Sequence, residues 1–312
     1  MGTRNNLLNI VQKINSEMGG DIEIIIVYDR FLTEVLSDTQ NMNNVKLILN
    51  SSGNLSPGRK RNIGAECSSG EILIFMDDDV DPDSSLFRFL KSDSDISHIV
   101  LPEIKTEIDI PFPLGDHVSG RAMVTACMII RRSIFFETGE FNTLLFNYRE
   151  DSEFFIRAVK KGFSVVFENG VYVNHPVRIT DLSTFRIFFT KNSYEPLFHK
   201  LVNGEYAHVI ESRPWSSSAN RIGISAATYF LLALLVVVIS LLITGNVTAL
   251  IAIVSALVLL TVSSVLTWNF AGESLVRSGS YRVFRIPLYI AYIVTIIPAR
   301  IFGSLKWRHF TL

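Results

Sequence analysis

Charged residues and cysteines are scarce in this sequence. Only 19% of its 312 residues are charged, and its two cysteines, Cys67 and Cys127, stand far apart. Two isolated cysteines without metal-ligand spacing exclude a disulfide framework and a thiolate metal site. We therefore expect both to be buried as small apolar side chains. The net charge of −1 gives no basic surface of the kind that nucleic acids need, so we expect no nucleic-acid partner.

Hydrophobic residues make up 48% of the chain, and with so little charge this balance is too apolar for an ordinary soluble enzyme. The excess lies after Arg221. Residues 222–243 and 247–268 are uncharged and long enough to cross a bilayer, so they predict a transmembrane hairpin. A third apolar run, within 284–303, has a length that fits either a spanning or an interfacial helix. The apolar residues that flank this run favour a spanning helix, and an interfacial or re-entrant helix stays open as the alternative.

Residues 181–220 carry a basic, aromatic and amphipathic pattern, for example around Phe185, Arg186 and Lys191. Such a segment either lies in a membrane interface or packs on the preceding domain. We therefore divide the chain into an α/β domain over 1–180, a juxtamembrane segment and a transmembrane region over 221–312.

Strand and helix patterns alternate in the first 180 residues, which predicts an α/β fold with a mostly parallel, doubly wound sheet. Helical spacing of apolar residues marks 5–17, 84–90 and 150–161, and Pro57-Gly58 is interpreted as a turn before a helix that starts near Asn62. Residues 103–120 are interpreted as a loop. Apolar and β-branched runs predict strands at 22–28, 45–49, 71–76, 97–101, 124–131, 163–167 and 171–173.

Three carboxylates follow one of these strands directly. Ile72–Met76 is an apolar run typical of a strand buried on both faces, and Asp77, Asp78 and Asp79 come next. Ligands of open α/β sheets bind beyond the carboxyl ends of strands. Like charges crowded there are relieved by a divalent cation, and Mg²⁺ and Mn²⁺ prefer carboxylate oxygens and bridge to phosphates. The pattern indicates a metal-assisted site for a phosphorylated substrate, with a solvated acidic turn as the alternative.

The surrounding motifs resemble the core signature of family 2 glycosyltransferases, which have the GT-A fold. Arg61-Asn62 opens a helix, Gly70-Glu71 makes a turn, and the strand then delivers the DxD motif at Asp77–Asp79. Further on, Glu150-Asp151 resembles the Glu-Asp motif of the family, and Gly139-Glu140-Phe141 resembles the Gly-Gly-Phe before it. The resemblance covers about residues 3 to 200 and implies a Rossmann-like GT-A domain.

The resemblance also implies roles for individual residues. Asp79 would ligate a divalent cation, Mg²⁺ or Mn²⁺, directly, and Asp77 would hold it through water or bind the ribose. His175, after the strand that follows the Glu-Asp motif, would be a third ligand, with a structural role as the alternative. The donor site would include Asp29, Lys60, Arg61, Asn62, Asp77, Asp78 and, from a loop near the membrane, Arg186.

Asp151 would be the catalytic base of an inverting transfer, which needs a carboxylate to take the proton of the acceptor hydroxyl. Glu150 is the second choice. The alternative for both is a pair of acids that interact with a helix dipole.

These features together predict an integral protein of the cell membrane with a cytoplasmic catalytic domain. It would move a sugar from a UDP- or GDP-linked donor to a polyprenyl or dolichyl lipid-linked, or other glycan, acceptor. Alternatives are a polysaccharide synthase subunit and a non-catalytic scaffold with the same fold. Family members open with a hydrophobic strand, and Gly2–Asn5 resembles the turn after it. The resemblance therefore predicts that this first strand is missing and is encoded upstream.

Overall fold

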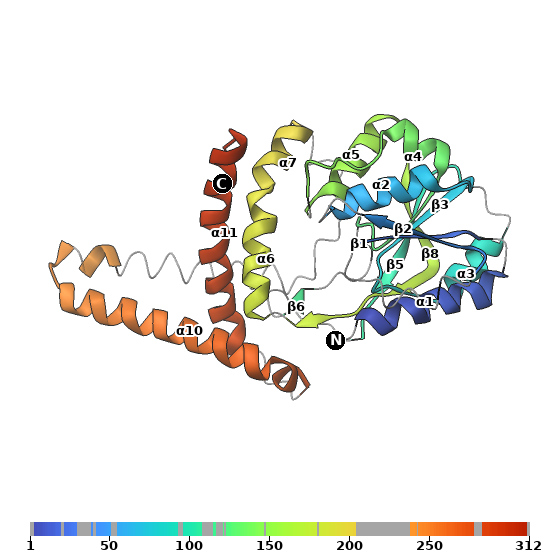
Figure 1. Cartoon of the computed structure of the whole chain (residues 1–312). Coiled ribbons are helices and arrows are strands. Elements are labelled where there is room, and N and C mark those ends of the chain that lie inside the picture. Colours follow the sequence, from blue (N-terminus) through green and yellow to red (C-terminus); the bar gives the residue numbers. More distant parts are fainter. Residues whose placement is uncertain are drawn as a thin grey trace. The chain divides into compact units, whose positions relative to one another are not determined.

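The computed structural model describes two compact units (Figure 1). The first comprises residues 1–107, 118–176 and 197–213, and the second comprises 108–117, 177–196 and 214–312. The residues that the structure describes are 3–19, 22–29, 39, 42–50, 55–92, 96–107, 115–116, 121, 123–146, 148–179, 181–203, 238–241, 243–277 and 283–310.

A five-stranded sheet lies at the centre of the first unit. In spatial order its strands are β3 (Ile72–Met76), β7 (Cys127–Arg131), β5 (Ile99–Lys105), β8 (Val165–Asn174) and β4 (Asp81–Pro82). Only β5 and β8 are parallel, and the other neighbouring pairs are antiparallel. The predicted α/β class is confirmed, but this sheet is mixed rather than mostly parallel. No helix is described between β5 and β7, and antiparallel neighbours need no helical crossover.

Two strands differ from their predicted limits for a common reason. β8 is one strand where two short ones were predicted, with Gly170 at φ 79° as an irregularity. Its outer half pairs with Glu103, Ile104 and Lys105, beyond a register shift in β5. Residues 103–105, predicted to be loop, are therefore strand. The pairing that extends them comes from residues about 70 positions away, which local sequence patterns do not report.

β1 (Ile24–Asp29) and β2 (Val45–Asn50) form a separate parallel pair. Among the described residues no hydrogen bond joins β1 to β3. The Glu23 carboxylate instead ties the start of β1 to the turn before β3, because it accepts from the backbone N–H groups of Ser69 (2.5 Å) and Gly70 (2.7 Å). The predicted missing strand stays a prediction.

Helices cover the sheet as the sequence patterns indicated, with two differences. α1 (Thr3–Met18), α3 (Ser84–Lys91) and α5 (Glu150–Lys160) match their predictions closely. α2 (Pro57–Cys67) begins at Pro57, so the interpretation of Pro57-Gly58 as a turn is wrong. The Ser56 side chain caps the helix by accepting from the Arg59 backbone N–H, and proline suits the first helical position. The short α4 (Arg132–Thr138) was not predicted.

An aromatic core holds α2, α4 and α5 against β3 and β7. Phe75, Phe135, Phe141 and Phe154 are buried, and adjacent rings lie 4.8 to 5.6 Å apart. Such ring pairs stabilise a core beyond the burial of their area. Cys127 is buried as predicted, whereas Cys67 is exposed because it ends α2 on its solvent side.

The second unit contains α6 (Leu182–Ser193), α10 (Val247–Arg277), α11 (Arg285–Trp307) and the short strand pair β6 (Gly115–Asp116) and β9 (Arg178–Ile179). α7 (Glu195–Val202) follows α6 and belongs mostly to the first unit. α10 and α11 each hold an apolar stretch long enough to cross a membrane. Most of the predicted span 222–243 lies outside the described residues.

Candidate active site

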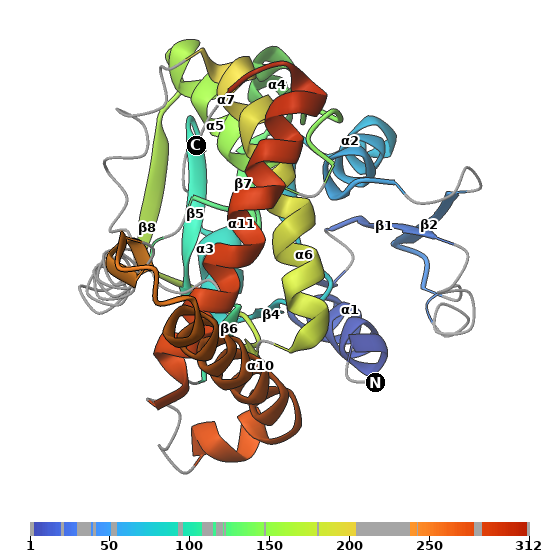
Figure 2. The same ribbon diagram turned by 90° about the vertical axis from the view of Figure 1, so that its left-hand side faces the viewer.

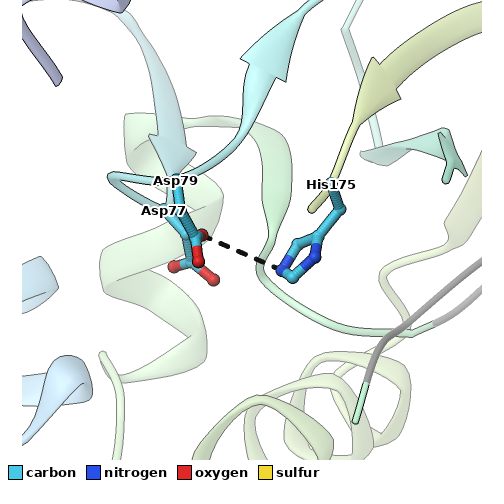
Figure 3. Close-up of side chains that lie close together, drawn as sticks. All are labelled: Asp77, Asp79 and His175. Carbon is cyan, nitrogen blue, oxygen red and sulfur yellow. Dashed lines mark ion pairs between the residues drawn. The ribbon is translucent and has the colours of Figure 1, made fainter. Parts of the chain in front are cut away.

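The turn after β3 brings two carboxylates to an imidazole. The Asp77 backbone N–H donates to Ala126 O (3.0 Å), and the Val80 N–H closes the turn onto Asp77 O (3.2 Å). β8 delivers His175, whose backbone N–H donates to Lys105 O (2.9 Å). The ligand atoms of Asp77, Asp79 and His175 lie within 4.8 Å of one another, and Figure 3 shows the three side chains turned toward a shared space. The sequence separates His175 from the acids by almost 100 residues, and the fold unites them.

The hydrogen bond of His175 directs its second ring nitrogen to this space. Nδ1 lies 2.9 Å from the carbonyl oxygen of Pro176. Because a carbonyl oxygen only accepts, Nδ1 carries the proton. In the neutral ring the lone pair is therefore on Nε2, which lies 3.9 Å from Asp79 Oδ1 (Figure 3). Metal-ligating histidines typically have their tautomer fixed in this way.

The three acids of the DxD motif differ in environment. Asp79 is 6% exposed, Asp77 is half-buried and Asp78 is exposed. A buried carboxylate is costly unless a cation or hydrogen bonds compensate it. The donor set of two carboxylates and an oriented imidazole therefore fits a divalent cation, with Asp79 as its most buried member.

Arg61 joins this cluster to the start of α5. Its Nη2 lies 2.6 Å from Asp77 Oδ1, and its Nη1 lies 3.1 Å from Glu150 Oε1. The guanidinium also lies over the ring of Phe141. Burial alone would lower the pKa of Arg61, but Asp77 and Glu150 outweigh burial and raise it. A permanent cation is thus held beside Asp77, one of the carboxylates that could hold a metal ion.

Glu150 and Asp151 occupy different surroundings although they are neighbours. Glu150 is buried, and burial together with the Asp151 charge raises its pKa to about 7 against the opposing effect of Arg61. Asp151 is half-buried, and its described hydrogen bonds, from Ser152 N (2.6 Å) and Ser152 Oγ (3.4 Å), use only Oδ1. Glu150 is therefore buried and paired with Arg61, whereas Asp151 is the more accessible of the two acids.

The residue before this pair adopts an unusual backbone. Arg149 has φ 69°, a left-handed conformation that costs a residue with a side chain about 1–2 kcal/mol. Its carbonyl oxygen still accepts from the Glu153 N–H (2.9 Å), so α5 starts directly after this kink. Strain of this kind often accompanies functional sites. No sequence pattern predicts this conformation, because arginine rarely adopts it.

Asn62 and Gly58 set the distance between α2 and α5. The Asn62 side chain donates to Phe141 O (2.9 Å) and accepts from Phe141 N (3.0 Å), and it is fully buried. A Cβ on Gly58 would lie 3.1 Å from Phe141 Cβ and 3.4 Å from Glu150 Cγ. Asn62, predicted to bind the donor, is thus engaged in holding the segment before α5. Gly58 and Phe141 were missed, although a glycine in the first turn of a helix is a signal for close approach.

The remaining predicted donor residues lie on separate elements. Asp29 is the last residue of β1, opposite Asn50 of β2. Lys60 is half-buried in the first turn of α2, one residue before Arg61. Arg186 is exposed on α6, in the second unit. Their contacts to a donor stay predictions.

Comparisons with known proteins found similar solved structures and a matching family model. Similar solved structures include GalNAc-T7 with UDP, GalNAc and Mn²⁺ (TM-score 0.46, 14% identity, 66% of this chain and 54% of that chain covered). They also include S. aureus TarS (TM-score 0.44, 15% identity, 69% of this chain and 43% of that chain covered). A third is S. aureus TarS 1-349 in complex with UDP (TM-score 0.45, 14% identity, 70% of this chain and 72% of that chain covered). The chain thus spans about half the length of the first two. No curated protein matches it by sequence.

Residues 3–110 match the family model described as Glycosyl transferase family 2. This stretch contains β1, α2, β3 and the DxD carboxylates. Over these residues the chain is thus similar to family 2 glycosyl transferases.

Proposed function

We propose that the protein is a membrane-anchored, inverting glycosyltransferase that moves a sugar from a nucleotide-sugar donor to a lipid-linked acceptor. The observation that carries this proposal is the Asp77–Asp79–His175 cluster, flanked by Arg61 and by the Glu150-Asp151 pair. A cation site, a buried guanidinium and a less buried carboxylate are together what transfer from a nucleoside diphosphate requires.

Asp79, Asp77 and His175 would hold the divalent cation. When bound, such an ion offsets the negative charge that develops on a diphosphate leaving group. The imidazole beside two carboxylates favours Mn²⁺ over Mg²⁺, because Mg²⁺ prefers oxygen ligands alone. UDP and Mn²⁺ in the GalNAc-T7 structure are the ligands of that protein, and we use them as the first to test.

Asp151 takes the proton of the acceptor hydroxyl as that oxygen attacks the anomeric carbon. The bond from this carbon to the diphosphate oxygen breaks, and the nucleoside diphosphate leaves with the electron pair. Asp151 is chosen because it is less buried than Glu150 and is not bonded to Arg61. Glu150 stays the second choice, since a pKa of about 7 also suits a base at neutral pH.

Arg61 positions the donor in this scheme. It forms an ion pair with Asp77, and a guanidinium binds diphosphate oxygens with two parallel hydrogen bonds. Donor binding would exchange the Asp77 bond for bonds to phosphate and leave Glu150 as the inner partner. Lysine at this position would keep the charge but lose the paired geometry.

The acceptor is proposed from the membrane-like helices. In α10, residues Val247–Val265 form an uncharged, mostly apolar stretch of which only 6% is buried within the protein. Such a surface is stable in lipid and not in water. An enzyme held at a bilayer meets acceptors that the bilayer presents, and a polyprenyl- or dolichyl-linked glycan, whose sugar carries the attacking hydroxyl, has this property. We place the catalytic domain in the cytoplasm, where nucleotide sugars are made.

The test uses the full chain in membranes with Mn²⁺, a panel of UDP- and GDP-sugars and a labelled lipid extract. We expect one donor to release its nucleoside diphosphate and to label a lipid, and Asp79→Asn to abolish both. Release of nucleotide without lipid labelling would refute the lipid acceptor only. A long polymer would show a polysaccharide synthase, and no turnover of any donor would show a scaffold.

A further inference from the structure

We propose that α11 does not cross the membrane but lies along its surface, with one apolar stripe inserted among the lipid headgroups and upper acyl chains. The stripe consists of Val294, Ile297, Ile301 and Leu305. This inference rests on the proposed membrane anchoring and goes beyond it, because it makes one face of the second unit a docking surface for a single leaflet. It does not depend on which sugar is transferred.

The first observation is where α10 meets α11. The apolar stretch of α10 ends at Val265, and Val265 packs with Leu288 and Phe284 at the N-terminal end of α11. The two helices run crosswise in both views, not side by side (Figures 1 and 2). If Val247–Val265 crosses the bilayer, the contact lies where the span ends, and a crosswise helix there follows the membrane plane.

The second observation is that α6 lies beside α11 and packs against it (Figures 1 and 2). Near the start of α11, the rings of Phe188 and Tyr292 lie 5.0 Å apart. Near its end, the Trp307 indole N–H donates to Ser193 O (3.1 Å), and a Cβ on Gly303 would lie 2.2 Å from the same oxygen. The two helices therefore form one closely packed pair.

The composition of α6 argues against a spanning pair. This helix has 12 residues and carries Arg186, which is exposed, together with Lys191 and Asn192. A spanning α11 would place these side chains inside the hydrocarbon, where charged groups are costly and rare. An interfacial α11 keeps α6 on the aqueous side.

The third observation is the outer face of α11. Val294, Ile297, Ile301 and Leu305 are 63%, 50%, 45% and 65% exposed, and their spacing of three and four residues places them on one helix face. Leu288, Ala299 and Gly303, all buried, mark the opposite face toward α6. An apolar stripe on a helix whose other face is packed is typical of helices that lie in a membrane interface.

Charge identifies the partner as a bilayer surface with anionic lipids. Exposed Lys306 and Arg308 follow the stripe, and Arg300 lies beside it in the same helix. Basic residues within a Debye length of an anionic leaflet are attracted to it, and their apolar stems fit the interface. α10, in the same unit, also exposes large apolar side chains.

Membrane depth separates the two arrangements directly. Single cysteines are placed at Val294, Ile297, Ile301 and Leu305 in the full chain that carries Cys67→Ser and Cys127→Ser. Each is spin-labelled in vesicles of zwitterionic and anionic phospholipid, and its depth is measured by electron paramagnetic resonance with oxygen and a nickel chelate. We expect one common, shallow depth. A spanning helix would change depth by about 16 Å between the first and last position, at 1.5 Å per residue, and this result would overturn the proposal.

Matched labels on α10 keep the outcomes distinct. Depth at Ile251, Val258 and Val262 should change along the helix if α10 crosses the bilayer. Absence of all three from the hydrocarbon would refute membrane anchoring and this inference together, while the transfer assay would be unaffected. Spin–spin broadening between stripe labels of different chains would show a second copy on the stripe and would also overturn the proposal.

In sealed vesicles, Arg277→Cys and Phe310→Cys should react from the same side, and reaction from opposite sides contradicts an interfacial α11.

Discussion

At the scale of single residues, Asp79 has the sharpest role because it is the most buried acid of the DxD motif and faces the oriented nitrogen of His175. We expect Asp79→Asn to weaken Mn²⁺ binding by more than the roughly 10- to 100-fold that the loss of an outer-shell partner costs. The reason is that the variant removes a directly ligating charge. Isothermal titration of the purified full chain in detergent measures this affinity without requiring turnover.

Asp78→Asn is the matched comparison, because it makes the same charge change one residue away on an exposed side chain. Its effect on Mn²⁺ affinity should be much smaller. Equal losses in the two variants would mean that overall negative charge, and not ligation by Asp79, governs binding.

The kinetics of variants can distinguish Asp151 from Glu150, because loss of the catalytic base lowers kcat whereas loss of a binding residue lowers donor affinity. If Asp151 is the base, Asp151→Asn lowers kcat by about 10²–10⁴, the usual contribution of a general base. Donor affinity stays near the wild-type value because the proton moves only in the transition state. Steady-state kinetics with the identified donor measure both. A collapse of donor affinity with little change in kcat would make Asp151 a binding residue.

Glu150 predicts a pH dependence of stability. Its pKa is raised from an ordinary value near 4.5 to about 7, so the folded protein binds more protons than the unfolded chain between these values. The contribution of Glu150 to the free energy of unfolding is therefore full below about pH 4.5 and is lost as pH rises toward 7. Glu150→Gln, a permanently neutral analogue, should remove this decline in thermal unfolding profiles.

Glu137→Gln is the control for this pH effect, since Glu137 is exposed and the charge change is the same. Its profile should keep the wild-type slope from pH 4.5 to 7. Identical slopes in wild type and Glu150→Gln would assign the pH dependence to another group.

Sequence reasoning singled out the residues of the candidate site but not the contacts between them. The strand followed by three acids and the basic residues of α2 are local patterns, so Asp77, Asp79 and Arg61 could be singled out directly. The bond from Arg61 to Glu150 joins residues 89 positions apart, and no local pattern encodes it. The same holds for the Asn62–Phe141 pair and for the left-handed backbone of Arg149, which depend on how α2 and α5 pack.

At the scale of elements, the contact of Gly303 with α6 offers a direct test of close helix packing. Gly303→Ala should destabilise the protein by about 1–3 kcal/mol, as overpacking does, because its Cβ would overlap Ser193 O. In a helix without such a contact, replacing glycine with alanine stabilises the protein by about 1 kcal/mol. A loss of stability in Gly303→Ala would therefore reveal the contact. Gly64→Ala in α2 is the control, since its Cβ would meet only Val27 at an ordinary 3.7 Å. Thermal unfolding in detergent compares both, and equal behaviour of the two variants would contradict the close packing.

Most elements followed from sequence patterns, and the exceptions share a cause. Period and composition located α1, α3, α5 and the apolar strands, because each of these elements has a locally defined buried face. The exceptions depend on other parts of the chain. Strand direction and the joining of two runs into β8 depend on the neighbouring strands, and the start of α2 at Pro57 depends on the Ser56 cap. The cap could have been found, because Ser56-Pro57 is a typical helix start.

At the scale of the whole molecule, the positive charges on both sides of α11 gain a simple explanation. Arg277, Arg282 and Arg285 precede most of this helix, and Lys306 and Arg308 end it. The positive-inside rule places both groups in the cytoplasm. A spanning α11 would put one group outside, whereas an interfacial α11 leaves both on the cytoplasmic side, together with the predicted location of the catalytic domain.

This arrangement predicts that the turn before α10 faces the outside. Thr244-Gly245-Asn246 directly precedes α10, at the end of its apolar stretch that is far from Val265. An Asn246→Cys variant in the background without native cysteines should therefore react with an impermeant maleimide in intact cells. Phe310→Cys, at the end of the chain beyond α11, should react only after permeabilisation, because the basic residues beside it hold it inside. Reaction of Phe310→Cys in intact cells would mean that α11 crosses the membrane. Protection of Asn246→Cys in intact cells would mean that α10 is inverted or does not span the membrane.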